Sequence, residues 1–355
     1  MPVVTRFVIE PLSIALTEPF GIAGGAQQRA ENVLVRLRLD DGTDGFGEAA
    51  PFAAVTGETQ ALVLDTLERL SSIVVGADVM RWRHLATILR EAAADVPSAR
   101  CAVESAVLDA LCRRAGLSLR SFFGGAQTEL WTDITIVTGD AERAEAAARR
   151  ATARGFTTLK VKVGGAPFEH DAARLRAIAR AAPAAALLLD ANGSLSADEA
   201  VALIDVLDGA RSRVVLFEQP TAAHDLDGLA RVRESGRIPV AADESVSSAA
   251  DVVRVARAVD VVNVKIMKSG LVETLDIVAV ARAHGLGLMV GGMVESELAM
   301  AVSAALAAGL GGFSFIDLDT PLFMENSPFE GGFHDSPPRL VEAETAVGHG
   351  VRPRR

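Results

Sequence analysis

Half of the 355 residues are hydrophobic and 23% are charged, which is ample material for a large buried core and excludes a disordered chain. The net charge of −11 comes from 46 acidic and 35 basic residues, and basic residues form no block beyond the short C-terminal tail. A nucleic acid or an anionic membrane is therefore disfavoured as a partner.

The N-terminal third predicts strands followed by helices. Hydrophobic and polar residues alternate over residues 33–40, and Asp41-Gly42 turns the chain into residues 43–49, a pattern typical of a β-hairpin. Over residues 58–123 the hydrophobic residues recur every three or four positions, which indicates about three helices. This order predicts an α+β unit.

The cysteines, the N-terminus and one long uncharged segment indicate where in the cell the protein is expected. Cys101 and Cys112 fall in the predicted helices and are interpreted as buried thiols in a reducing compartment. The N-terminus lacks the pattern of a signal peptide, so we expect a cytoplasmic protein. Residues 298–316 carry no charge over about the length of a membrane span, but glycines interrupt them. We expect a buried helix, a glycine stop and a strand there, and no membrane partner.

From Trp131 onward, short hydrophobic strands alternate with Ala-rich helical stretches. Ser196 and Ser248 are predicted to lie at the starts of two of these helices. Helical connections of this length require parallel strands, and eight such strands close a barrel. The eight predicted strands are residues 131–137, 158–163, 186–190, 214–218, 240–243, 261–265, 287–290 and 313–317.

Charged residues lie at the ends of the second to the sixth of these strands. Because the carboxyl ends of parallel strands meet at one rim of a barrel, where such barrels keep their active sites, we expect these side chains to lie together. The residues are Lys160, Lys162, Asp190, Glu218, Asp243 and Lys265.

The three carboxylates among them suit Mg²⁺, which prefers hard oxygen ligands. No Cys or His accompanies Asp190, Glu218 and Asp243, which disfavours zinc. Each carboxylate alone could instead cap the helix that follows its strand. Three of them at successive strand ends favour a metal site.

The lysines suggest proton transfer. Lys160 and Lys162 alternate with hydrophobic residues, so both are expected to point into the barrel, and Lys265 would face the same centre from the opposite side. A metal ion, a second cation and partial burial are expected to lower the pKa of a lysine toward the range of a general base. One lysine on each face of a carbon next to a Mg²⁺-bound carboxylate could remove a proton from one face and return one to the other.

Five segments together resemble the muconate-lactonizing-enzyme branch of the enolase superfamily. They are residues 158–162, 189–192, 217–220, 243–245 and 262–265. The resemblance extends to residues 45–51 and implies an α/β fold, a (β/α) barrel of the modified TIM type with an α+β N-terminal capping domain. It divides the chain into a capping domain (1–125) with a lid loop near 20–26, a barrel (126–320) and a C-terminal segment that returns to the capping domain (321–355).

Residues 316–321 resemble the Asp-x-Asp element by which dipeptide epimerases of this branch hold the α-ammonium group of the substrate. Two carboxylates suit an amine, whereas a succinyl or muconate substrate would meet only like charge there. Residues 132–136, 265–270 and 292–296 are also similar to this subgroup. A capped, solvated turn is the alternative reading for Asp317 and Asp319.

The resemblance implies epimerisation of a dipeptide at its C-terminal residue, by a 1,1-proton transfer through an ene-diolate. Asp190, Glu218 and Asp243 would bind one Mg²⁺ per subunit, and no other cofactor is implied. Lys162 and Lys265 would be the two acid/base groups, supported by Lys160 and by Lys268, which is the other candidate for the second base. The implied substrate-binding residues are Asp317, Asp319, Thr135, Gly24, Gly25, Met293 and Glu295.

The lid departs from that of epimerases acting on Ala-Glu, which commonly supplies an arginine for the glutamate side chain. Gly24 or Gly25 stands at that position here, and Arg29 is the nearest arginine. The sequence therefore leaves hydrophobic or mixed dipeptides open beside Ala-Glu. Two other functions remain open: an N-succinylamino acid racemase or o-succinylbenzoate synthase, and a barrel that binds without catalysis. The sequence does not determine the oligomeric state, and a homo-oligomer is possible for barrels of this kind.

Overall fold

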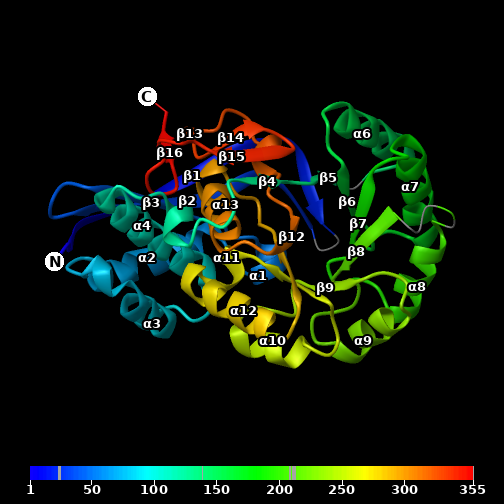
Figure 1. Ribbon diagram of the computed structural model, residues 1–355, viewed down its shortest axis with the longest axis horizontal. Coiled ribbons are helices and arrows are strands. Elements are labelled where there is room, and N and C mark those ends of the chain that lie inside the picture. Colours follow the sequence, from blue (N-terminus) through cyan, green and yellow to red (C-terminus); the bar gives the residue numbers. More distant parts are fainter. Residues whose placement is uncertain (23–24, 138, 208, 210–212, 355) are drawn as a thin grey trace.

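The computed structural model describes residues 1–22, 25–137, 139–207, 209 and 213–354 and consists of an N-terminal unit beside a barrel (Figure 1). The N-terminal unit contains an antiparallel sheet of β1 (Val4–Ile22), β2 (Gly25–Leu39) and β3 (Asp44–Ala49). The predicted hairpin is confirmed as β2 and β3. The sequence did not predict β1, which contains two prolines. Proline is tolerated in a strand at the edge of a sheet, and β1 lies at such an edge.

The helices of the N-terminal unit pack on one another and on this sheet. They are α1 (Ala53–Thr56), α2 (Gln60–Val74), η1 (Val79–Arg81), α3 (Trp82–Ala92), α4 (Pro97–Ala115) and α5 (Leu119–Phe122). Cys101 and Cys112 lie buried on α4 as free thiols. A Cβ atom at Gly47 on β3 would lie 2.0 Å from the carbonyl oxygen of Ala102, so α4 rests directly on the backbone of β3.

The barrel is one sheet of eight parallel strands, which run in chain order from β5 to β12. The strands are β5 (Ile134–Ile136), β6 (Thr158–Lys162), β7 (Ala186–Asp190), β8 (Val214–Glu218), β9 (Val240–Ala242), β10 (Val261–Val264), β11 (Gly287–Val290) and β12 (Phe313–Ile316). The first and last strands meet where the amide of Asp133 donates a hydrogen bond of 2.9 Å to the carbonyl of Ile316. The predicted (β/α) barrel is therefore confirmed.

Helices cover the outside of the barrel (Figure 1). They are α6 (Ala141–Ala153), α7 (Phe168–Ala181), α8 (Ala197–Asp205), α9 (Leu226–Glu234), α10 (Ala249–Val255), α11 (Ile266–Ser269), α12 (Leu271–Ala283) and α13 (Glu297–Leu310). Ser196 and Ser248 are the predicted N-caps of α8 and α10. The uncharged segment 298–316 forms α13, a turn at Gly311 and β12, as expected. No helix in the described part of the chain has the length and apolar character needed to cross a membrane.

The prediction of one strand over residues 131–137 was wrong. The segment contains β4 (Glu129–Trp131), which pairs with β15, and then β5 of the barrel. The chain changes sheets between them, because the amide of Thr132 bonds to Pro338 and that of Asp133 to Ile316. Alternation of side chains alone does not reveal such a change of partner.

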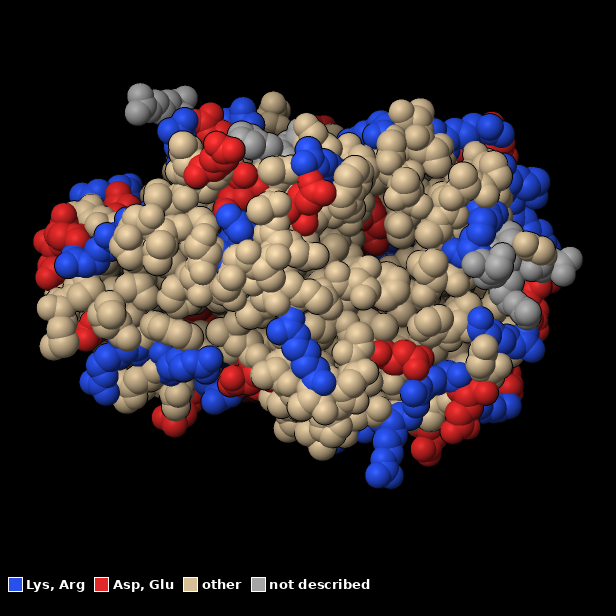
Figure 2. Space-filling model, in the orientation of Figure 1, with Lys and Arg blue, Asp and Glu red and all other residues tan. Residues whose placement is uncertain are grey.

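The described C-terminal residues form one 3-10 helix and four short strands, which lie against both parts of the molecule. They are η3 (Thr320–Phe323), β13 (Phe329–Gly331), β14 (Phe333–Ser336), β15 (Arg339–Glu342) and β16 (Val351–Pro353). The amide of His349 donates to Asp109 on α4 at 2.9 Å, and β15 pairs with β4. On the face of the molecule in Figure 2, acidic and basic side chains are interspersed.

The close contact of α4 with β3 predicts that Gly47→Ala destabilises the protein strongly. The new methyl group would overlap the backbone of α4, and we expect the free energy of unfolding to fall by about 3 kcal/mol. Gly139→Ala is the matched control, because a Cβ there makes only ordinary contacts at 3.7 Å. Urea titrations of both variants measure the difference, and equal stabilities would contradict the packing described.

Candidate active site

The chain contains only four lysines, and all four lie at the same rim of the barrel. Lys160 and Lys162 end β6, while Lys265 and Lys268 follow β10. In the strand order, β6 and β10 are four positions apart, so the two pairs come from opposite sides of an eight-stranded barrel. All four side chains are buried.

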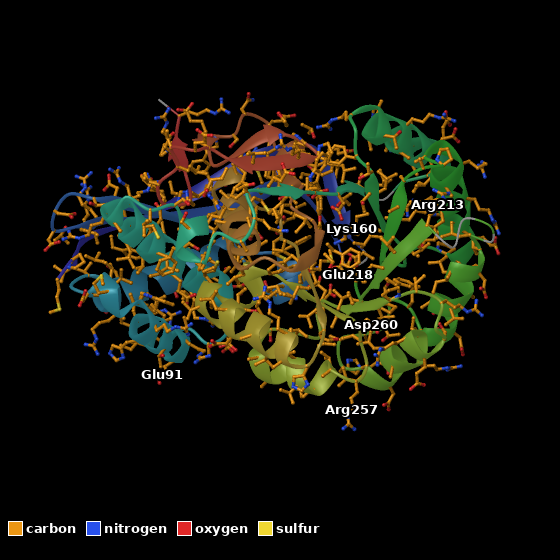
Figure 3. The ribbon with its side chains drawn as sticks, viewed as in Figure 1. Glu91, Lys160, Arg213, Glu218, Arg257 and Asp260 are labelled. Carbon is orange, nitrogen blue, oxygen red and sulfur yellow. The ribbon has the colours of Figure 1, made fainter. Side chains whose placement is uncertain are left out.

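Lys160 is the most connected of the four. Its Nζ lies 3.0 Å from Asp190 Oδ2, 2.8 Å from Glu218 Oε2 and 2.7 Å from Asp317 Oδ2. Figure 3 shows Lys160 and Glu218 near each other in the interior of the barrel. The ammonium group of Lys160 therefore joins two of the predicted metal ligands to one of the predicted ammonium ligands.

Lys162 lies beside the same strand ends but has fewer partners. Its Nζ donates to Asp190 Oδ2 at 2.6 Å and to Asn192 Oδ1 at 3.3 Å. Asn192 adopts a positive φ of 44° after β7, and its amide bonds back to Asp190 Oδ1 at 2.9 Å. The backbone conformation at Asn192 thus brings its side chain to Lys162.

Lys265 and Lys268 share one carboxylate but face different spaces. Lys265 Nζ lies 2.6 Å from Asp243 Oδ2, and Lys268 Nζ lies 2.5 Å from Asp243 Oδ1. Lys265 lines the same cavity as Lys160 and Lys162, whereas Lys268 lines a different cavity at the boundary with the N-terminal unit. This placement favours Lys265 over Lys268 as the second base.

The pKa values of Lys160 and Lys265 are raised in the structure. Burial disfavours their charged forms, but the nearby carboxylates outweigh it and raise the pKa of both groups. Asp190 is the strongest of these for Lys160, and Asp243 for Lys265. The sequence could place the charges at one rim but not show that each lysine points at a carboxylate.

The three predicted metal ligands form a buried acidic set that suits a hard divalent cation. Asp190, Glu218 and Asp243 are all fully buried at neighbouring strand ends. Burial and the charges of the two aspartates raise the pKa of Glu218 to about 8, and the ammonium group of Lys160 contacts Glu218 Oε2. Asn263 orients the other oxygen, to which its Nδ2 donates at 2.7 Å. The donors therefore fit Mg²⁺ in type and number.

A second carboxylate set lies nearby. Asp133, Asp317 and Asp319 each place one oxygen within 4.8 Å of the others, and all three side chains are buried. The predicted metal ligands are more widely spread, because their carboxylates face the lysines. Within the described residues, the second set alone brings three carboxylates this close.

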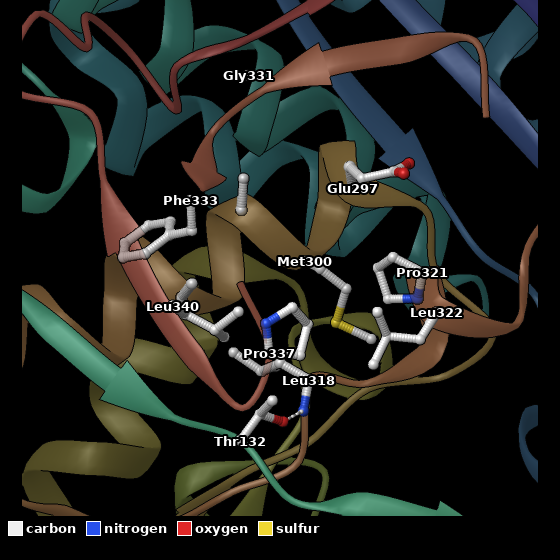
Figure 4. Close-up of a pocket in the computed structure, with 12 residues that line it drawn as sticks. Thr132, Glu297, Met300, Leu318, Pro321, Leu322, Gly331, Phe333, Pro337 and Leu340 are labelled. Atoms are coloured by element: carbon white, nitrogen blue, oxygen red, sulfur yellow. Dashed lines mark hydrogen bonds between the residues drawn. The ribbon is translucent and has the colours of Figure 1, made fainter. Parts of the chain in front are cut away.

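The Asp-x-Asp element lies at the end of β12, and its two aspartates line the same cavity as the lysines. Leu318 between them points the other way, into an apolar cavity beside α13 (Figure 4). The backbone at Leu318 is held in this orientation, because its amide donates a hydrogen bond of 2.9 Å to Thr132 Oγ1. Asp317 and Asp319 are therefore held on the cavity side, and the alternative of a solvated turn is wrong, since both are buried.

The other predicted substrate-binding residues divide into two groups. Thr135 and Met293 line the cavity, and the amide of Thr135 donates to Asp319 Oδ2 at 2.6 Å. Glu295 is fully buried, accepts from the amide of Met293 at 2.7 Å and is not among the residues lining the cavity. Gly25 begins β2, which makes the predicted lid loop the tip of a hairpin, while Gly24 lies outside the described residues.

The N-terminal unit supplies an apolar wall, of which the sequence predicted only the lid loop that contains Phe20. Phe20, Phe52 and Val55 line the cavity together with the polar residues of the barrel rim. The ring of Phe20 packs edge-on against Phe323, with centroids 5.5 Å apart, which fixes the hairpin tip to the barrel side. Arg29 points elsewhere, because its guanidinium donates to the carbonyl of Ser13.

Two further polar residues escaped the sequence reading. Asn192 was seen only as part of a motif, and its contact with Lys162 depends on its left-handed backbone. Asp133 stands two positions before Thr135, and this spacing places both on one face of an extended chain. The period of two could therefore have indicated Asp133.

Two family models match the chain over most of its length. The model described as "Mandelate racemase / muconate lactonizing enzyme, N-terminal domain" matches residues 4–124, and "Enolase C-terminal domain-like" matches residues 142–355. The chain belongs to the mandelate racemase/muconate lactonizing enzyme family of the enolase superfamily. The resemblance inferred from the sequence is confirmed.

Relatives in this family carry more specific names. An "Aromatic dipeptide epimerase" of Herpetosiphon aurantiacus is 50% identical over 96% of each chain. An "L-Ala-D/L-Glu epimerase" of Thermotoga maritima is 34% identical over 95% of this chain and 98% of that one. A dipeptide epimerase of Enterococcus faecalis, solved with Mg and the dipeptide L-Leu-L-Tyr, is 32% identical, with a TM-score of 0.94 over 98% of this chain and 99% of that chain.

The two carboxylate sets predict different outcomes of mutation for metal binding. We expect one Mg²⁺ to bind per chain in isothermal titration calorimetry, and Asp190→Asn to weaken binding by roughly tenfold or more, because one anionic ligand is lost. Asp198→Asn on α8, with a side chain 77% exposed, is the control. Loss of binding in Asp317→Asn but not in Asp190→Asn would assign the metal to the second set instead.

Proposed function

We propose that the protein is a Mg²⁺-dependent dipeptide epimerase that inverts the α-carbon of the C-terminal residue. The observation that carries this proposal is the single cavity lined by Lys162, Lys265 and the two aspartates of the Asp-x-Asp element. Bases on two sides of a carbon suit inversion, and paired carboxylates suit a free amine. The names of the relatives support the same substrate class.

The substrate orientation follows from the charges. The α-ammonium group of the dipeptide binds Asp317 and Asp319, which lie at one end of the cavity beside Thr135. Its carboxylate lies toward Asp190, Glu218 and Asp243, the proposed ligands of one Mg²⁺ per subunit. When bound, the cation would stabilise the negative charge that develops on the carboxylate as the α-proton leaves.

The proton moves between the two lysines through the substrate. One lysine, in its neutral form, removes the α-proton from one face of the carbon. The other lysine, in its ammonium form, returns a proton to the opposite face, so the connectivity is unchanged and the configuration inverts. Lys160 remains charged because its carboxylate neighbours stabilise the ammonium form, and it assists by holding Asp190, Glu218 and Asp317 in place.

The side chain of the C-terminal residue lies against the wall of the N-terminal unit. Phe20, Phe52 and Val55 present carbon to the cavity, and among the described residues no arginine lines it. An apolar pocket favours a hydrophobic or aromatic side chain over the carboxylate of glutamate. We therefore propose hydrophobic dipeptides, rather than Ala-Glu, as the preferred substrates.

The two-lysine arrangement predicts an asymmetric loss of exchange. Lys162→Met and Lys265→Met should each abolish epimerisation, by roughly a thousandfold or more, because inversion needs both groups. Each variant should still exchange the α-hydrogen for deuterium in one stereoisomer, and the two variants should retain opposite stereoisomers. Mass spectrometry and chiral chromatography in D₂O with Mg²⁺ measure both, and circular dichroism checks folding. Retention of the same stereoisomer by both variants would refute the two-base assignment.

The apolar wall predicts that one added cation changes the substrate preference. Val55→Arg should raise kcat/KM for L-Ala-L-Glu relative to L-Ala-L-Phe by about tenfold or more, because a guanidinium pairs with the glutamate carboxylate. Val253→Arg on α10 is the control. Val253 is 56% exposed, so an arginine there adds the same charge outside the cavity. An unchanged preference in Val55→Arg would place the C-terminal side chain elsewhere.

A further inference from the structure

Asp133 is a buried carboxyl group to which neither the fold nor the proposed reaction gives a role. It is 3% exposed, and one of its oxygens lies within 4.8 Å of an oxygen of Asp317 and of Asp319. It is not among the residues that line the cavity, whereas the other two aspartates are. Asp133 therefore stands behind the proposed ammonium site.

Backbone hydrogen bonds fix two of the three aspartates. Asp133 is held where the first and last barrel strands meet, by the bond from its amide to the carbonyl of Ile316. Asp317 follows that strand directly, and its own amide donates to Val290 at 2.9 Å. The backbone of Asp133 and that of Asp317 are therefore held by the strands at which the barrel closes.

The charges in this group are unbalanced. Asp317 pairs with Lys160 at 2.7 Å, and Asp319 accepts a hydrogen bond from the amide of Thr135. Within the part of the chain that the structure describes, Asp133 forms no ion pair, and Oδ1 of Asp133 and Oδ1 of Asp319 are buried without a hydrogen-bond partner. Buried oxygen atoms without partners are costly unless a ligand or a proton satisfies them.

The protonation of the three groups differs for physical reasons. Burial, followed by the charges of Asp317 and Asp319, raises the pKa of Asp133 well above its usual range, and a side-chain hydrogen bond with Asp317 acts in the same direction. Burial also opposes ionisation of Asp317, but Lys160 outweighs it and lowers the pKa of Asp317. Asp133 is thus the neutral acid of the pair, and Asp317 the anion.

We propose that Asp133 is a positioning residue for substrate recognition: its neutral carboxyl group donates a hydrogen bond to the carboxylate of Asp317 and holds that carboxylate toward the cavity. The inference rests on the proposed function, because Asp317 and Asp319 must bind the α-ammonium group of a dipeptide. With Asp133 neutral, the ammonium group faces the anion of Asp317 and the carboxyl group of Asp319, whose pKa burial and Asp317 raise to about 7. Without Asp133, Asp317 keeps its ion pair with Lys160 but loses the proposed hydrogen bond that holds its carboxylate toward the cavity.

The test compares Asp133→Asn with Asp133→Ala. The asparagine amide can still donate to Asp317, so we expect KM for L-Leu-L-Phe to stay within threefold of the wild type. In Asp133→Ala we expect KM to rise at least tenfold while kcat changes less than threefold. The inhibition constant of N-acetyl-L-Leu-L-Phe, which has no ammonium group, should change less than threefold in both variants.

A double-mutant cycle separates positioning from a general structural effect. If Asp133 acts through Asp317, adding Asp133→Ala to Asp317→Asn should raise KM no further. A tenfold rise in Asp133→Asn would overturn the proposal, because a neutral donor would then not suffice, and this outcome is readable even if the alanine variant does not fold. An unchanged KM in a folded Asp133→Ala would also overturn it. Absence of dipeptide turnover by the wild type would overturn the proposed function itself, and this inference with it.

Discussion

The ammonium group of Lys160 is the interaction on which the site depends. It is buried and within 3.0 Å of three carboxylates, two at the ends of β7 and β8 and one after β12. A buried charge without partners is strongly destabilising, so these four residues have to be present together. Because Asp190 and Glu218 belong to the proposed metal site and Asp317 to the proposed ammonium site, Lys160 links the positions of the two ends of the substrate.

The apolar wall of the cavity has to be held with comparable accuracy, although it belongs to another part of the chain. Glu48 at the end of β3 achieves this at the N-terminus of α13, where its carboxylate accepts from the amides of Ser296 at 3.0 Å and Ala299 at 3.2 Å. These hydrogen bonds favour the ionised form of Glu48, but burial outweighs them and raises its pKa. Asn32 adds a bond of 2.9 Å to the carbonyl of Val294. β3, on which α4 packs at Gly47, thus also holds the N-terminal unit against the barrel through Glu48.

The sequence could predict the polar half of the site, but of the apolar half it predicted only the lid loop that contains Phe20. Lys162, Asp190 and Glu218 were predictable because strand ends in a regular βα repeat fall on one rim, and periodicity locates the ends. Phe20, Phe52 and Val55 line the cavity only because the hairpin and α1 reach across to the barrel, which no local pattern encodes. The direction of the pKa shift of Lys265 could not be predicted from the sequence, since it depends on whether attraction to Asp243 exceeds the cost of burial.

The distribution of basic residues fits the proposed chemistry. Apart from the four lysines of the site, every basic side chain among the 35 is an arginine, including buried ones. Arg174 illustrates the difference: it lies beneath β6 and donates to the carbonyl of Lys162 at 2.8 Å and to Asp171 at 3.1 Å. A guanidinium stays charged at any physiological pH and fixes several acceptors through its planar fork, which suits support of the backbone. A base that removes an α-proton must be able to exist in a neutral form, which a lysine can adopt and an arginine cannot. All four lysines lie at this rim, and two of them, Lys162 and Lys265, are the proposed bases.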